Sequence, residues 1–473
     1  MDAVSRGGSI LGTRSLAGMS LVYALGGLAF KGVAVLTVPI LARLLTPAEL
    51  GLLDAAAIMA GLIGLAAGMG SEQAVAYLQT RTPNAASLWG SAMTLVGAMG
   101  SVLVLMAVVL REPLALFLTG DARHADVIVA SSIYGAIIGF TAAGLNAVRL
   151  RGTPRRYALG SFAVVLAETG AALTIALLVP EPVLPMVFGW AAGAAVVTVV
   201  LLLAHLPRLG RPDGALVRRL LSFGLPLVPM VAAWLIGDLA IRSALARGAD
   251  LAALGEYGIA SRIASVVALV VTGIGVAWQP YVFRTYRPET PHRTTYQAVY
   301  LFLALGMLGG VLIAMSPEVI LFAAGADYAN ANQVVAPLVA GLVTLGAFVL
   351  IGGTVSASGS TGLIAVAAFS GAATQALLAV PLIGALGLAG AGVASLGGYL
   401  TAVLILLAVD RRFRVSRVTV SWAAGGTVVA LGLIGAVVAS SLPTGVRLSG
   451  LIGLVAAALL GWVLLRRGRR ATT

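Results

Sequence analysis

Residues 30–77 read FKGVAVLTVPILARLLTPAELGLLDAAAIMAGLIGLAAGMGSEQAVAY and contain two long apolar segments joined by a short polar corner, Arg43 to Glu49. Each segment carries a charge: Lys31, the only lysine of the chain, in the first, and Asp54 in the second. A charged side chain inside a bilayer is costly and by default indicates function. The other apolar segments of the chain, and the charges within them, are therefore compared with this pair.

The composition is that of a polytopic membrane protein. The 473 residues are 60% hydrophobic and 10% charged, with a mean hydropathy of +1.03, whereas about a quarter of the residues of soluble domains are charged. The net charge of +13 does not indicate nucleic-acid binding, because the basic residues lie in short loops between apolar runs. The absence of cysteine from the sequence excludes disulfides, thiolate metal sites and cysteine nucleophiles.

Fourteen apolar runs approach or exceed the roughly 20 residues that a spanning helix needs. The sequence thus predicts an all-α fold, and the first run is too long for a signal-peptide core. Two short breaks, SASGS at 356–360 and IGALGL at 383–388, divide 331–409 into three spans. The predicted spans are 18–42, 48–77, 86–110, 126–148, 157–179, 184–206, 220–245, 252–282, 294–315, 331–355, 361–383, 388–409, 419–440 and 447–465.

The distribution of basic residues predicts that both termini are cytoplasmic, because cytoplasmic loops carry the excess of Lys and Arg. With fourteen spans, all but eight of the 30 Lys and Arg residues fall on the side of the N-terminus. The eight others are Lys31, Arg43, Arg111, Arg123, Arg242, Arg247, Arg262 and Arg447. No loop is long enough for a catalytic domain, which argues against a membrane-bound polymerase or ligase.

A weak internal repeat divides the chain into two halves. A shift of 204 positions places Leu41–Arg43 on Leu245–Arg247 and Leu50–Gly51 on Leu254–Gly255. Six spans separate the copies, so the halves would be related by a pseudo-two-fold axis along the membrane normal, with a cleft between them near the midplane. The predicted domains are an N-terminal lobe at 1–206, a linker at 207–219, a C-terminal lobe at 220–409, and two extra spans with a basic tail at 410–473.

Four stretches together resemble one family. Residues 41–77, GEYGIASRIASVVALVVTGIGVAWQPYVF at 255–283, LFAAGADYANANQVVAPL at 321–338 and IGALGLAGAGVASLGGYL at 383–400 are similar to spans of polysaccharide transporters. These are the O-antigen-type flippases of the multidrug/oligosaccharidyl-lipid/polysaccharide exporter superfamily. The resemblance covers most of the chain, and the order and spacing of the stretches carry it, since no single motif is diagnostic.

The resemblance implies a non-enzymatic flippase that works by alternating access. Its cargo would be an undecaprenyl-pyrophosphate-linked oligosaccharide, moved from the inner to the outer leaflet of a bacterial cytoplasmic membrane for cell-surface polysaccharide biosynthesis. No cofactor is expected; the membrane potential, H⁺ or Na⁺ are the candidate driving forces. The expected contacts are the cargo and membrane lipids, with a polymerase or assembly protein as a candidate partner and a monomer as the expected state. Two alternatives stay open: a multidrug or cation antiporter of the same superfamily, and a lipid II flippase.

Three cations within or near the ends of spans are candidate pyrophosphate ligands: Lys31, Arg242 and Arg262. The alternative for each is a structural ion pair, and Asp238 stands four residues before Arg242 on one helix face. Three acids within spans, Asp54, Glu168 and Asp238, are candidates for ion coupling or counter-ions of these cations.

Other polar residues of the spans carry weaker expectations. Glu256, near the start of its span, is expected to reach water. Gln375 is a candidate for hydrogen bonds to sugar hydroxyls or to a neighbouring helix.

Overall fold

The computed structural model describes residues 37–79, 81–82, 84–150, 154–205, 210–225, 228–285, 291–358 and 360–409, together with positions 33, 426, 429–430, 433–434 and 437. These residues form helices and connecting turns and include no strand. Ten helical runs among them are long and apolar enough to cross a membrane. Lys31 and most of the predicted spans 18–42, 419–440 and 447–465 lie outside the described residues, so the count of fourteen spans and the position of both termini stay predictions.

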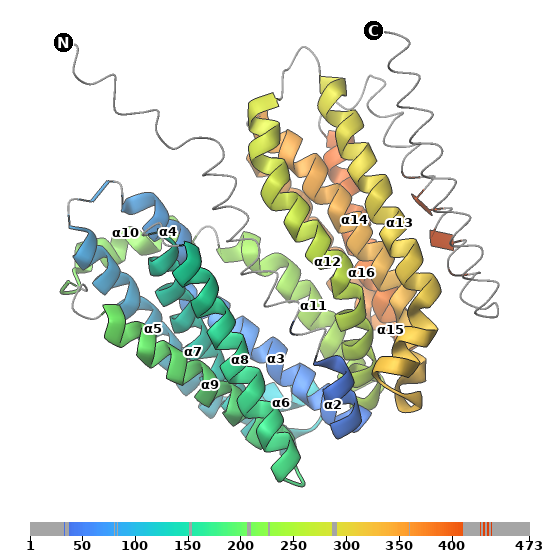
Figure 1. Ribbon diagram of the computed structural model, residues 1–473, viewed down its shortest axis with the longest axis horizontal. Coiled ribbons are helices and arrows are strands. Elements are labelled where there is room, and N and C mark those ends of the chain that lie inside the picture. Colours follow the sequence, from blue (N-terminus) through green and yellow to red (C-terminus); the bar gives the residue numbers. More distant parts are fainter. Residues whose placement is uncertain are drawn as a thin grey trace.

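Two groups of helices follow each other along the chain (Figure 1). The N-terminal group consists of α2 (Val38–Leu44), α3 (Pro47–Gly68), α4 (Ser71–Leu78), α5 (Ala85–Val109), α6 (Arg111–Thr119), α7 (Ala125–Leu150), α8 (Pro154–Leu178) and α9 (Val183–His205). The linker helix α10 (Gly214–Gly224) comes next. The C-terminal group consists of α11 (Val228–Gly248), α12 (Leu251–Thr285), α13 (Pro291–Ala323), the short helix η4 (Ala326–Ala331), α14 (Asn332–Ala357), α15 (Thr361–Leu386) and α16 (Leu388–Val409).

Most of these helices agree with the predicted spans, including the division of 331–409 into three. Two predicted spans need correction. The span at 48–77 is interrupted at Met69 and Gly70, both at positive φ, which separates α3 from α4. The span at 220–245 begins later, at Val228, because residues 214–224 form the separate helix α10.

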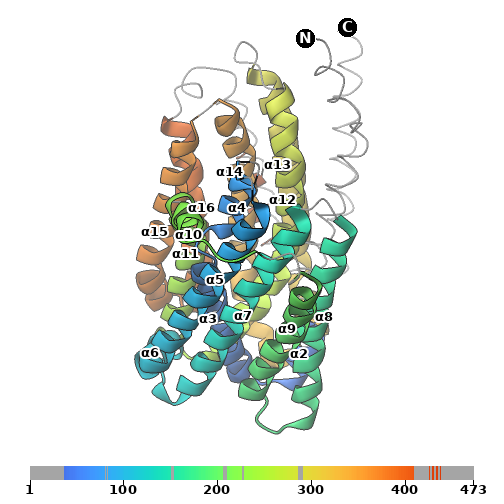
Figure 2. The same ribbon diagram turned by 90° about the vertical axis from the view of Figure 1, so that its left-hand side faces the viewer.

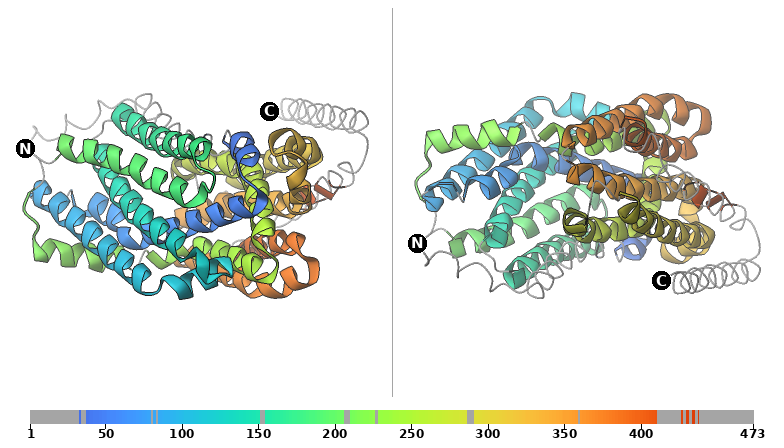
Figure 3. Two further views of the ribbon diagram at one scale, coloured as in Figure 1. Left: turned by 90° about the horizontal axis from the view of Figure 1, so that it is seen from below. Right: turned by 90° about the horizontal axis from the view of Figure 1, so that it is seen from above.

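The two groups converge at one end of the molecule and diverge toward the other (Figure 1). We call the converging end the corner end; it holds the turns Leu45–Thr46, between α2 and α3, and Ala249–Asp250, between α11 and α12. Helix α10 and the end of α4 lie away from the corner end, at the other end of the N-terminal group, as the perpendicular view also shows (Figure 2). Seen along the helices, α3 in blue reaches from its own group toward the helices of the other (Figure 3). The packing of α3 on α12 and α11 and of α6 on α11 joins the groups.

The turn before α3 is stabilised by a complete capping box. The Thr46 hydroxyl accepts from the backbone N–H of Glu49 at 3.3 Å, while a Glu49 carboxylate oxygen accepts from the backbone N–H of Thr46 at 2.8 Å. Pro47 occupies the first helical turn, where its missing N–H leaves no bond unmade. The turn therefore fixes where α3 starts, and with it the depth of every residue on α3.

Replacing Thr46 with Ala removes one half of this box, because alanine has no oxygen to accept from Glu49. We expect Thr46→Ala to lower the free energy of unfolding by about 1 kcal/mol. Thermal unfolding of the purified protein in detergent measures the change. Thr46→Ser keeps the hydroxyl and serves as the control; equal losses in both variants would show that the cap itself contributes nothing.

Two glycines allow α3 and α12 to cross with their backbones in contact at the corner end. A Cβ on Gly51 would overlap the carbonyl oxygen of Leu251, and a Cβ on Gly255 would overlap that of Pro47. The two contacts are related by the 204-residue shift, since Pro47 corresponds to Leu251 and Gly51 to Gly255. The same surface of each half thus packs on the other, as two-fold related surfaces do.

Helix α10 belongs by its packing to the N-terminal group. Its apolar side, including Leu216 and Leu220, is buried against α4 and α5. The Phe223 ring stacks on Tyr77 with centroids 4.4 Å apart. Gly70, at φ +65°, leaves space for the backbone of Gly224. The linker is therefore anchored to one group before the chain enters the other at Val228.

Candidate functional site

Four charged side chains from both groups meet beside the α3–α12 crossing. Asp54 comes from α3, Asp238 and Arg242 from α11, and Arg262 from α12. With a rise of 1.5 Å per residue, Asp54, Arg242 and Arg262 lie roughly 9 to 17 Å along their helices from the corner end. The cluster combines two cations with two acids, so its formal charges balance.

Arg242 is held by two acids at once. Its Nε donates to Asp238 Oδ2 at 2.9 Å, one turn earlier on the same helix, and its Nη1 makes an ion pair with Asp54 of the other group. The guanidinium also lies over the ring of Tyr257, 5.2 Å from its centroid, and the Tyr257 hydroxyl donates to Asp238 Oδ1 at 3.4 Å. Arg242 is thereby oriented from three helices.

Arg262 has one described charge partner and one unmet donor. Its Nη2 lies 3.4 Å from Asp54 Oδ1. Its Nη1 is buried without a hydrogen-bond partner among the described residues. Gly258 makes room for the pair, because a Cβ there would lie 3.0 Å from Arg262 Nη1 and 3.3 Å from Asp54 Cγ. A buried guanidinium N–H without an acceptor is available for an anion.

The structure brings together four of the six residues that the sequence singles out. Arg242, Arg262, Asp54 and Asp238 form one cluster, and the Asp238–Arg242 ion pair that the spacing offers is present. Lys31 lies outside the described residues, so its place in the cluster stays a prediction. The ligand and coupling roles of the others also stay predictions.

Glu168 lies apart from the cluster, on α8 of the N-terminal group. It is 6% exposed and lies near the Tyr134 hydroxyl of α7, and its Oε1 has no hydrogen-bond partner among the described residues. The Tyr134 ring in turn packs against Trp190 of α9, with centroids 5.5 Å apart. Glu168 is thus a second, separate buried acid.

Contacts that the sequence analysis did not anticipate also close the corner end. The Tyr328 hydroxyl of η4 donates to the carbonyl oxygen of Leu45 at 2.8 Å, across the two groups. Glu256, expected to reach water, is only 8% exposed, and its Oε1 accepts from Asn330 Nδ2 at 3.1 Å. That expectation was wrong because η4 covers the start of α12. The only sequence signal was the polar run Asp327–Asn332 between two apolar spans.

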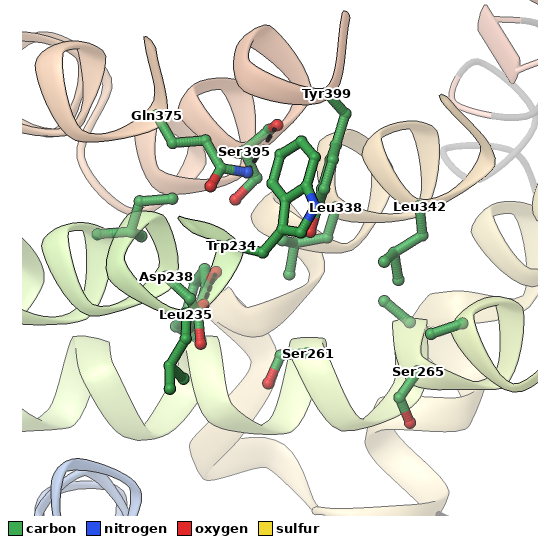
Figure 4. Close-up of a pocket in the computed structure, with 14 residues that line it drawn as sticks. Trp234, Leu235, Asp238, Ser261, Ser265, Leu338, Leu342, Gln375, Ser395 and Tyr399 are labelled. Atoms are coloured by element: carbon green, nitrogen blue, oxygen red, sulfur yellow. Dashed lines mark hydrogen bonds between the residues drawn. The ribbon is translucent and has the colours of Figure 1, made fainter. Parts of the chain in front are cut away.

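A cavity of about 440 Å³ lies within the C-terminal group, next to the charge cluster (Figure 4). It is bordered by α11, α12, α14, α15 and α16. Trp234 projects into the middle of the view, with Tyr399 behind it and Asp238 below (Figure 4). The residues that line the cavity are Trp234, Leu235, Asp238, Ile241, Tyr257, Ser261, Ala264, Ser265, Ala268, Leu338, Leu342, Gln375, Ser395 and Tyr399.

The fold identifies the class of protein. Over 87% of this chain, it is similar to the structure titled "Lipid II flippase MurJ, inward closed conformation", with a TM-score of 0.72, 12% identity and 98% of that chain covered. It is also similar to an inward-facing MATE multidrug transporter, with a TM-score of 0.63, 14% identity, and 87% of this chain and 95% of that chain covered. A third similar structure is the MATE multidrug transporter DinF-BH, with a TM-score of 0.61, 20% identity, and 87% of this chain and 99% of that chain covered. The class is therefore that of membrane proteins with the flippase and multidrug-transporter fold.

The sequence identifies the family. The family model described as "Polysaccharide biosynthesis protein" matches residues 17–286, more than half of the chain, and the chain belongs to this family. A search of curated protein sequences found no match. The identities to the solved structures are too low to carry over a substrate, so those likenesses establish the fold alone.

Proposed function

We propose that the protein is a flippase for an undecaprenyl-pyrophosphate-linked oligosaccharide. The observation that carries this proposal is the pair Arg242 and Arg262, which share Asp54 and include one buried donor that has no partner among the described residues. Two guanidinium groups on adjacent helices suit the two phosphates of a pyrophosphate, since guanidinium binds phosphate through paired, charge-assisted hydrogen bonds. Membership of the polysaccharide biosynthesis family supports a glycan-bearing cargo.

Asp54 gives this site a way to couple binding to opening. Its carboxylate occupies the position beside the two arginines that phosphate oxygens would take, and it is the contribution of the N-terminal group to the cluster. A pyrophosphate that replaces Asp54 removes an ionic contact between α3 and the C-terminal group. Binding of the cargo thus weakens the corner end and favours the state in which that end is open.

The direction of transport rests on the predicted orientation, with both termini in the cytoplasm of a bacterium and the corner end outside. In that orientation the diverging end faces the cytoplasm and receives cargo. An inside-negative membrane potential then favours export of the anionic head group, by roughly 2.3 kcal/mol per charge per 100 mV. Asp238 and Glu168 are the proposed sites for H⁺ or Na⁺ coupling, since both are acids within spans predicted from the sequence. Lys31 is proposed as a third ligand of the pyrophosphate.

Reconstitution in liposomes tests the proposal directly. The probe is a fluorescent undecaprenyl-pyrophosphate oligosaccharide, and its arrival in the opposite leaflet is measured by quenching. We expect Arg262→Gln and Arg242→Gln each to slow translocation by about 10- to 100-fold, because a hydrogen bond to a charged group contributes roughly 1.5–3 kcal/mol. Lys31→Ala is also expected to slow translocation.

Arg123→Gln is the matched control, because the Arg123 side chain is 89% exposed and its ion pair among the described residues is with Asp121, two positions away. Undiminished translocation in all of the Arg242, Arg262 and Lys31 variants would overturn the site assignment. Efflux of organic cations by the wild type, without movement of the lipid-linked sugar, would instead identify a multidrug antiporter.

A further inference from the structure

The cavity of the C-terminal group has two chemically different sides. One side is aromatic and apolar. The ring centroids of Trp234 and Tyr399 lie 4.8 Å apart, and Leu338 and Leu342 also line this side. The other side presents hydroxyl, amide and carboxylate groups, from Ser261, Ser265, Ser395, Gln375 and Asp238. At about 440 Å³ the cavity has the size of a small-molecule pocket and greatly exceeds a single ion.

The polar side retains hydrogen-bonding capacity for a ligand. Gln375 is 2% exposed, and its Nε2 donates to the carbonyl oxygen of Ser395 at 3.3 Å, while its Oε1 is buried without a partner among the described residues. The Ser261 hydroxyl donates to the Gly258 carbonyl at 2.9 Å and keeps its lone pairs as acceptors. An unmet buried acceptor is costly unless a bound group satisfies it.

The charges of the cavity select among possible ligands. No Lys or Arg is among the described residues that line it, so an anionic group finds no cation on this part of the wall. The single acid in the lining, Asp238, is already paired with Arg242, so an organic cation finds no uncompensated carboxylate. A neutral ligand with one flat apolar face and an edge of hydroxyls fits both sides. Pyranose sugars have this form, with C–H groups on the ring faces and hydroxyls around the rim.

We propose that this cavity binds a neutral sugar residue of the cargo, with Trp234 as the platform on which the ring stacks. This proposal rests on the proposed function, because it assigns a place to the glycan of the lipid-linked substrate. Asp238 belongs both to the cavity lining and to the charge cluster. A pyrophosphate on Arg242 and Arg262 therefore places the sugar attached directly to it at the mouth of the cavity. The site selects a neutral hexose over an acidic sugar at this first position.

The test compares two probes that differ only in the sugar: undecaprenyl pyrophosphate carrying one neutral hexose, and bare undecaprenyl pyrophosphate. Binding to the purified full chain in nanodiscs is measured by calorimetry. We expect the wild type to bind the sugar-bearing lipid about tenfold more tightly, corresponding to one well-placed stacking and hydrogen-bonding contact. Trp234→Ala should abolish this preference and leave the affinity for the bare lipid within about twofold, while Trp234→Phe, which keeps a ring, should retain most of the preference.

Phe369→Ala is the matched control, because Phe369 is an aromatic of α15 that is 41% exposed and does not line the cavity. The sugar proposal is overturned if the wild type binds both lipids equally, or if Trp234→Ala weakens both equally. It is also overturned if Trp234→Ala changes only the Na⁺ dependence of binding and leaves the preference for the sugar-bearing lipid intact. Failure of the wild type to bind either lipid would instead overturn the proposed function.

Discussion

Gly51→Ala is expected to force apart the two groups of helices at the corner end. The added methyl group would overlap the carbonyl oxygen of Leu251, a backbone atom that cannot move aside by a change of rotamer. Overpacking of this kind costs about 1–3 kcal/mol. Here it destabilises only the state in which the corner end is closed, because α3 and α12 are in contact only in that state. Transport should fall steeply, because a flippase that cannot close one end cannot complete its cycle. Gly255→Ala, which meets the carbonyl oxygen of Pro47, should have the same effect.

The measurement uses spin labels on the two sides of the corner. The chain has no cysteine, so cysteines introduced at the exposed positions Ala48 and Ala249 accept labels selectively. Electron–electron distances should become longer in Gly51→Ala. Gly68→Ala is the control on the same helix, because a Cβ at Gly68 has nothing within 4 Å. Unchanged distances in Gly51→Ala would show that the glycine contact does not hold the end closed.

The double variant tests whether the two glycines act as one contact. Once Gly51→Ala has separated α3 from α12, a second methyl at Gly255 meets less resistance. We therefore expect the combined change in stability to be smaller than the sum of the two single changes, as is usual for residues in contact. Full additivity would contradict a shared crossing.

Asp54→Asn is expected to have opposite effects on stability and on binding of the head group. Asparagine has nearly the same shape but no charge, so Arg262 loses its one described charge partner and Arg242 loses one of two. Removing one member of a buried ion pair lowers the free energy of unfolding by up to about 3–5 kcal/mol. Affinity for bare undecaprenyl pyrophosphate should nevertheless rise by roughly tenfold, because the carboxylate no longer competes with phosphate oxygens.

Thermal unfolding and calorimetry of the same preparations measure the two effects. Asp121→Asn is the control, since Asp121 pairs with the exposed Arg123 two residues away, and exposed pairs contribute little. In Asp54→Asn with Arg262→Gln, part of the lost stability should return, because no unpaired charge is then left at that position. Loss of both stability and pyrophosphate binding in Asp54→Asn would contradict the competition between carboxylate and phosphate.

Much of the fold was predictable because a bilayer imposes long apolar helices, whose length and order can be read from local composition. The span prediction did not use the cap that starts α3, and it missed the break between α3 and α4. The capping box Thr46-Pro47-Ala48-Glu49 was a readable signal for the start of α3 that the span count did not use. The break at Gly70 depends on its close approach to Gly224, and that contact depends on how α10 folds back on the N-terminal group.

The candidate site was predictable only as a set of residues. The sequence by itself determined the membrane class, the helical spans, the repeat of 204 residues and the Asp238–Arg242 pair, because each depends on periodicity or on neighbours within a turn. Only the tertiary structure decided that Asp54 stands between Arg242 and Arg262, that Gly51 and Gly255 pack on each other, and that Trp234 and Gln375 border one cavity. These contacts join residues more than 100 positions apart, and long-range pairing is set by how whole helices cross, which no local pattern encodes.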